Sequence, residues 1–280
     1  MSFQQALAWS LFWIGLSLLV ALGISMYFGS APATAFLTGY ALEKALSIDN
    51  LFVFLMLFSY FRVGRAAQRR VLNYGIIGVL VLRGLLIFVG IALVQQFEWL
   101  MYVFGAIVIY TGFIMAFGGD EEFDPAKSRT VRLVSKVFTI STDYHDSRFF
   151  VRQNGKKIAT QLFLVLVVIE VMDVLFAVDS VPAIFSVTRD PLIVYGSNIL
   201  AILGLRSLYF LLERAHDAFH FVKHGVGVIL WFVGVKMILP AFWPVARIDN
   251  SISLGVILVI LLVSIVLSVW IKPKGIRNEE

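Results

Sequence analysis

Residues 158–185 read IATQLFLVLVVIEVMDVLFAVDSVPAIF, an apolar run that contains three carboxylic acids. A helix that crosses the hydrocarbon core of a bilayer needs about 20 apolar residues, and this stretch supplies them. A charged side chain at that depth costs at least a few kcal/mol unless it faces protein, water or a counter-ion. The acids Glu170, Asp173 and Asp179 therefore indicate a membrane helix that lines an interior site.

The rest of the chain has a similar composition. Of the 280 residues, 60% are hydrophobic and 15% are charged, whereas soluble domains carry about 25% charged residues. We expect an all-α, polytopic bundle of eight membrane helices that forms a single transmembrane domain. The chain has no Cys, which excludes disulfides, thiolate-bound metals and a thiol nucleophile. The apolar segments are residues 6–28, 33–61, 71–94, 99–117, 158–185, 192–212, 225–239 and 252–271.

Lys and Arg indicate the orientation, because cytoplasmic loops carry the excess of positive charge. With the N-terminus inside, 17 of the 23 Lys and Arg residues fall on the cytoplasmic side, and only Arg189 and Arg247 fall on the other. The sequence therefore predicts that both termini are cytoplasmic. Since the basic residues follow the membrane segments, the net charge of +5 indicates no nucleic-acid partner. The loop 119–157 is too short and too polar for a catalytic domain, so function is expected inside the membrane.

An internal repeat relates two groups of three segments, about residues 33–118 and 158–240, with extra helices at 6–28 and 252–271. Three is an odd number of crossings, so the second copy enters the membrane from the opposite side. Inverted repeats of this kind are typical of transporters, in which the binding site lies near the midplane where the repeats meet. The matched positions are Glu43 with Asp173, Asp49 with Asp179, Arg83 with Arg206, Gly105 with Gly227 and Gly112 with Gly234.

Helical geometry separates the two acids of each copy. Six residues turn a regular helix by about 600°, which leaves Glu43 about 120° from Asp49. Either the helix is interrupted, or the two acids serve different positions. In the second copy, Pro182 has no N–H and frees the carbonyl of Val178 beside Asp179. That region is either a cation-binding break in the helix or an ordinary proline kink.

Basic residues accompany the acids inside the segments. Two interpretations stay open: the charges form buried ion pairs that fix the helix register, or the acids hold a cation while the bases act as partners or gates. We expect Arg83 and Arg206 to pair with acids, and Asp49 to approach Asp179 near the midplane. The oxygen donors suit Mg²⁺, Ca²⁺ or Mn²⁺ and not soft metals. The ion-pair or gating residues are Lys44, Arg83, Arg206 and Lys236.

Residues 43–54 (EKALSIDNLFVF) and 170–185 (EVMDVLFAVDSVPAIF) resemble the TerC family of integral membrane proteins, in particular its Alx-type members. The likeness covers nearly the whole chain. It implies an inner-membrane (plasma-membrane) exporter of manganese ions that has no cofactor, with exchange for protons as an option. Alx-type members usually begin with one more membrane segment, so the full product is expected to have eight or nine. The metal residues that the resemblance implies are Glu43, Asp49, Asn50, Glu170, Asp173, Asp179 and Ser180.

Two other functions would use some of the same residues. Handling of metal without net transport, by delivery to exported proteins or in tellurium resistance, would use the same acids. An intramembrane aspartyl protease also uses two membrane Asp residues, but its Tyr-Asp and Gly-x-Gly-Asp motifs are absent, so we expect no enzyme. The sequence does not indicate the oligomeric state.

Two smaller features leave a choice open. His216, His220 and His224 are spaced to share one helix face and could collect metal, but a solvated loop helix is favoured because the resemblance does not include them. Lys236 is matched by Ile114 in the first copy, which predicts a single gate or counter-ion at Lys236 and no symmetric pair.

Overall fold

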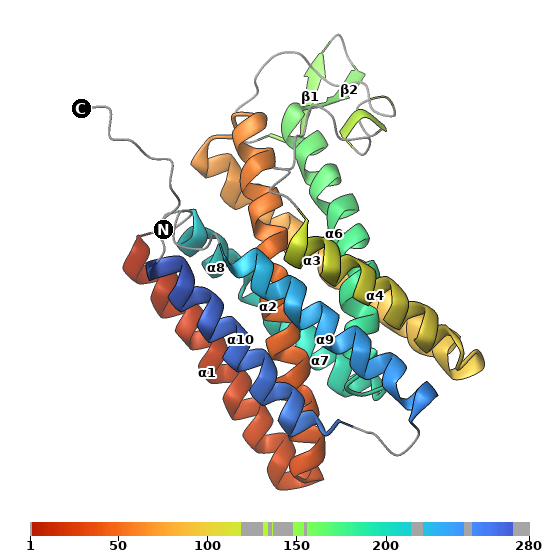
Figure 1. Cartoon of the computed structure of the whole chain (residues 1–280). Helices are drawn as coiled ribbons and strands as arrows, with labels where there is room; N and C mark the ends of the chain where they lie inside the picture. Colours follow the sequence, from red (N-terminus) through yellow and green to blue (C-terminus); the bar gives the residue numbers. More distant parts are fainter. Residues whose placement is uncertain are drawn as a thin grey trace.

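The computed structural model is a bundle of long helices with a short β-hairpin at one end (Figure 1). It describes residues 2–118, 131–133, 136, 148–153, 156–213, 221–243 and 248–270. The hairpin pairs β1 (Phe150–Gln153) with β2 (Lys156–Ala159) in antiparallel register. The helices are α1 (Phe3–Phe28), α2 (Ser30–Tyr60), α3 (Arg65–Gln96), α4 (Leu100–Phe117), α6 (Gln161–Phe185), α7 (Pro191–Leu203), α8 (Leu205–Leu212), α9 (Val222–Phe242) and α10 (Asn250–Trp270).

Every apolar segment predicted from the sequence is helical over most of its length, which confirms an all-α membrane protein; the segment 158–185 begins with two residues of β2 before α6 starts at Gln161. The segment 192–212 consists of two helices, α7 and α8, bent by 41° at a break. Among the described residues, six helices are long and apolar enough to cross a membrane, or seven if the bent pair is one span. The span left out of this count is α2, which carries Glu43, Lys44 and Asp49. The predicted total of eight crossings therefore stays a prediction.

Local sequence sets where the helices begin. The side chain of Thr160 accepts the N–H of Phe163 at the start of α6, and Asp190 accepts two N–H groups at the start of α7, where Pro191 takes the first position. Gly29 separates α1 from α2 and has a φ of 94°. Glycine has no Cβ, so this backbone conformation costs it little free energy. The predicted break after the first segment is thus confined to one glycine.

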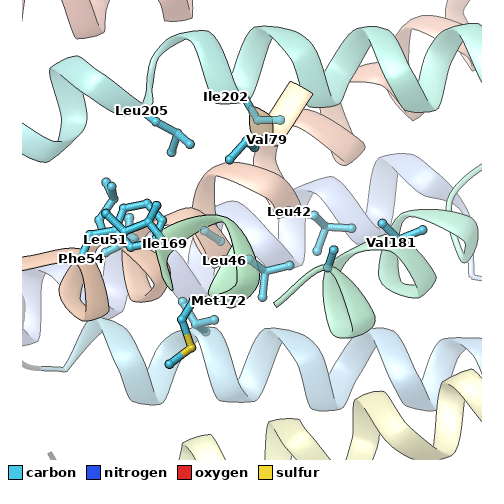
Figure 2. Close-up of a cluster of buried hydrophobic side chains, with 14 of the residues drawn as sticks. Leu42, Leu46, Leu51, Phe54, Val79, Ile169, Met172, Val181, Ile202 and Leu205 are labelled. Atoms are coloured by element: carbon cyan, nitrogen blue, oxygen red, sulfur yellow. The ribbon is translucent and has the colours of Figure 1, made fainter. Parts of the chain in front are cut away.

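The helices pack in pairs that each take one member from either half of the chain. Helix α2 packs along α7, α3 along α6 and α4 along α9, while α1 and α10 both lie against α2. Figure 2 shows the shared apolar core, to which α2 contributes Leu42 and Phe54, α6 contributes Ile169 and Met172, and α3 contributes Val79. The polar residues described below lie on the same helices.

The α4–α9 pair is a close crossing of two backbones. A Cβ atom added to Gly112 would lie 2.7 Å from the carbonyl oxygen of Gly227, and one added to Gly234 would lie 2.9 Å from the carbonyl oxygen of Gly105. Small residues at such a crossing allow membrane helices to approach until their backbones touch. The glycines that the sequence aligned between the two copies therefore face one another.

The outer helices expose apolar side chains. Leu11, Phe12 and Leu19 on α1, with Leu258 and Leu262 on α10, are all more than half exposed. An apolar surface of this extent is unusual on a protein dissolved in water and suits contact with lipid.

Candidate functional site

Four helices bring polar side chains together around Arg83 of α3. Its Nε and Nη2 donate to the two carboxylate oxygens of Asp173 on α6, each at 2.8 Å. Its Nη1 donates to Oε1 of Glu43 on α2 and, at 3.4 Å, to Oδ1 of Asn198 on α7. Nδ2 of Asn198 donates in turn to Oε2 of Glu43 at 3.1 Å. We call Glu43, Arg83, Asp173 and Asn198 the Arg83 core.

The Arg83 core is closed to solvent. Glu43, Arg83 and Asp173 are 0%, 1% and 2% exposed. The prediction that Arg83 pairs with acids is confirmed, and its contact with Asp173 is bidentate. Two carboxylates share one guanidinium, so the core carries a net charge of −1 when both acids are ionised. Two of the predicted metal residues are thus engaged by an internal cation in this conformation.

Glu170 lies one turn before Asp173 but outside the Arg83 core. Its carboxylate packs against α3 at Gly75 and Gly78, where an added Cβ on Gly78 would lie 2.6 Å from Oε1. Its Oε2 is buried and has no hydrogen-bond partner among the described residues. The two glycines therefore make the space that this carboxylate occupies.

Asp49 and Asp179, the second acid of each copy, are half-buried and form no ion pair within the described part of the chain. Asp179 accepts a hydrogen bond from Oγ1 of Thr111 on α4 at 3.1 Å. Lys223, near the start of α9, is close enough for its positive charge to interact favourably with the carboxylate of Asp49. Each aspartate is followed by a buried polar residue, Asn50 or Ser180, and Oγ of Ser180 has no partner there.

The expected approach of Asp49 to Asp179 does not occur, because α2 and α6 run in opposite directions (Figure 1). Glu43 and Asp173 meet at Arg83. Because the two helices are antiparallel, the six residues from Glu43 to Asp49 run in one direction and the six from Asp173 to Asp179 run in the opposite direction. At 1.5 Å per residue, Asp49 and Asp179 lie about 18 Å apart along the bundle. No group of three or more His, Asp or Glu that could hold a metal ion occurs among the described residues.

Both α2 and α6 are unbroken helices, and α6 continues past Pro182. Of the two alternatives for the paired acids, the structure therefore favours different positions over an interrupted helix. The break lies elsewhere, at Gly204 between α7 and α8. Nζ of Lys44 donates to the carbonyl of Ala201 in the last turn of α7, at 2.9 Å. A cation at a helix C-terminus also interacts favourably with the helix dipole.

Arg206, which the repeat aligns with Arg83, does not pair with an acid among the described residues. Its Nη1 donates instead to Oδ1 of Asn73 on α3 at 2.8 Å. The prediction for Arg206 is therefore wrong for this part of the chain. The physical reason is the break at Gly204, which turns α8 away from the axis of α7 and carries Arg206 out of the Arg83 core.

Lys236 of α9 lies against the start of α10. Its Nζ donates to Oδ1 of Asn250 at 2.9 Å and to Oγ of Ser253 at 2.8 Å. The neighbouring Asp249 lies outside the spans, and hydrogen bonds from Ser251 hold the pKa of its carboxyl below the usual range. Asp249 therefore keeps a negative charge near Lys236, as a counter-ion requires.

Asn198 is a member of the Arg83 core that the sequence prediction missed. An amide in the middle of an apolar segment was the available signal, since polar side chains inside membrane helices hydrogen-bond to neighbouring helices. Of the three histidines, His216 and His220 lie outside the described residues, and His224 lies near the start of α9 with its ring 6.0 Å from that of Phe221.

Comparison with known proteins agrees with the fold and the motifs. The model of the integral membrane protein TerC family matches residues 28–275. A Photorhabdus laumondii protein named "Putative membrane-bound redox modulator Alx" is 46% identical over 100% of this chain and 89% of its own length. The Escherichia coli K12 protein of the same name is 45% identical over 98% of this chain and 87% of its own length. No solved structure matches. The chain belongs to the TerC family of integral membrane proteins.

Proposed function

We propose that the protein exports a divalent metal cation, manganese, across the inner (plasma) membrane, with both termini in the cytoplasm. The observation that carries the proposal is the pair Asp49 and Asp179, two aspartates inside membrane helices that no Lys or Arg of the described residues neutralises by direct contact. An unpaired carboxylate at that depth is costly and typically marks an ion pathway.

The chemistry around these aspartates supports a hard cation. Asp49 is followed by Asn50, while Asp179 has Ser180 beside it and Thr111 bonded to it. Carboxylate, amide and hydroxyl oxygens are the ligands of Mg²⁺, Ca²⁺ and Mn²⁺. The choice of manganese among these ions rests on the resemblance to TerC-family exporters.

The pairing of the helices supports an inverted repeat. A two-fold axis between the copies would exchange α2 with α6, α3 with α7 and α4 with α9. This exchange converts the α2–α7 pair into the α6–α3 pair, and it maps the α4–α9 pair onto itself. These are the pairs that pack together. Asp49 and Asp179 then lie on either side of the Arg83 core, as two positions along one pathway would.

Manganese flux into vesicles that contain the purified protein tests the proposal. We expect Asp49→Asn and Asp179→Asn each to abolish the flux at normal protein level, because loss of one negative charge weakens an oxygen site for a divalent ion. Glu98→Gln, an exposed carboxylate between α3 and α4, is the control and should transport like the wild type. Wild-type flux in both Asn variants would contradict the proposal.

Metal delivery without transport is the competing function. It predicts specific Mn²⁺ binding by the wild type but no protein-dependent flux of any divalent ion. Flux and binding measured on one preparation separate the two functions.

The name of the relatives refers to redox modulation, but this chain has no Cys with which to carry out thiol exchange.

A further inference from the structure

The Arg83 core lies where two helix pairs meet. Within the α3–α6 pair, Arg83 and Asp173 are joined by two hydrogen bonds of 2.8 Å. Within the α2–α7 pair, Asn198 and Glu43 are joined by one of 3.1 Å, and a Cβ on Gly39 would lie only 2.9 Å from Oγ of Ser197. Each pair is therefore fastened internally by contacts that do not involve the other.

The polar contacts between the two pairs within the Arg83 core depend on one nitrogen atom. Nη1 of Arg83 donates both to Oε1 of Glu43 and to Oδ1 of Asn198. The other nitrogens that bond, Nε and Nη2, are held by Asp173. Arg83 can thus lose Glu43 and still keep a complete bidentate partner, whereas loss of Asp173 would leave it with weaker contacts.

Nη1 of Arg83 also marks a position suited to a cation. It lies between a carboxylate oxygen of Glu43 and the amide oxygen of Asn198, both fully buried. These are the oxygen types that bind hard divalent ions. A divalent ion attracts Glu43 more strongly than a single positive charge shared with Asp173.

Resting on the proposed function, we propose that Glu43 exchanges partners during transport. In the empty protein it binds Nη1 of Arg83, and in the loaded protein it binds the divalent ion together with Oδ1 of Asn198. Asp173 holds Arg83 in both states and is not a metal ligand. Arg83 is then a built-in competitor of the cargo, and its contact with Glu43 is a polar link between the helix pairs, which the ion breaks.

The decisive variant is Arg83→Gln/Asp173→Asn, which neutralises both members of the bidentate pair and leaves Glu43 intact. Removing both charges of this pair keeps the net charge of the core at −1, and Glu43, which loses Nη1, keeps the hydrogen bond from Nδ2 of Asn198. We expect one Mn²⁺ to bind to the purified full-length protein at least about tenfold more tightly than to the wild type, equivalent to about 1.4 kcal/mol. Electron paramagnetic resonance of free Mn²⁺ gives both the affinity and the number of ions.

Two further variants test Glu43 and Asn198 separately. Glu43→Gln should bind one Mn²⁺ fewer per chain than the wild type. Asn198→Leu keeps the size of the side chain and the Arg83–Asp173 pair but removes the amide oxygen, and should bind one ion at least about tenfold more weakly. This variant also decides the question if the double variant does not fold.

The outcomes separate this inference from the proposed function. Weaker Mn²⁺ binding by the double variant would identify Asp173 as a ligand and overturn the exchange. Unchanged stoichiometry in Glu43→Gln, or unchanged affinity in Asn198→Leu, would also overturn it while flux by the wild type stands. A wild type that neither binds nor transports a divalent ion would overturn both.

Discussion

The crossing of α4 and α9 allows a sharp stability prediction, since the Cβ atom of any added side chain meets atoms of the facing helix that cannot rotate away. In Gly112→Val, the Cβ would lie 2.7 Å from the carbonyl oxygen of Gly227 and 2.9 Å from Cβ of Leu230. The helices must separate by about 0.5–1 Å, which forfeits a quarter to a half of the dispersion energy of the affected contacts. Overpacking of this kind costs about 1–3 kcal/mol of unfolding free energy.

Gly15→Val on α1 is the matched control, because nothing lies within 4 Å of a Cβ added there. Its unfolding free energy should change by no more than about 0.5 kcal/mol. Thermal unfolding of the purified variants, followed by circular dichroism, should place Gly112→Val about 2–12 °C below the wild type and Gly15→Val close to it. Equal melting temperatures for the two variants would refute the close crossing.

Two other substitutions test the buried charges. Arg83→Met leaves Glu43 and Asp173 without a counter-charge and should lower the unfolding free energy by about 3–5 kcal/mol. Arg65, which is 70% exposed, pairs with Glu213 at 3.3 Å, and Arg65→Met should cost about 1 kcal/mol or less. Similar melting temperatures for the two variants would contradict this. Lys44→Met removes the donor to a helix-end carbonyl and should cost about 1–3 kcal/mol, and a variant as stable as the wild type would show that this hydrogen bond contributes little.

The membrane helices could be predicted from the sequence because an apolar run of sufficient length has few alternatives in lipid. The close crossing could be predicted only in part. The spacing of Gly105 and Gly112 matched that of Gly227 and Gly234, but an alignment does not say that matched residues touch. Contact follows from the way the two halves interlock, which is a property of the folded chain.

The site was predicted less well than the fold. The pairing of Arg83 with acids could be predicted from the free-energy cost of burying a charge, since a buried guanidinium needs a partner. The separation of Asp49 from Asp179 was missed. Each aspartate follows by six residues an acid that binds Arg83, and because α2 and α6 are antiparallel, the two aspartates lie on opposite sides of the Arg83 core. Arg206 was misassigned because the bend at Gly204 leaves no mark in an apolar segment whose hydropathy is continuous.

The matched arginines illustrate a limit on duplicated architecture. Arg83 takes both oxygens of Asp173 and one of Glu43, while Arg206, its match in the other copy, donates to Asn73 instead. A single side chain at the centre of two related halves can come from only one of them. The centre of this protein is therefore chemically asymmetric, although the two halves that meet there are matched in sequence.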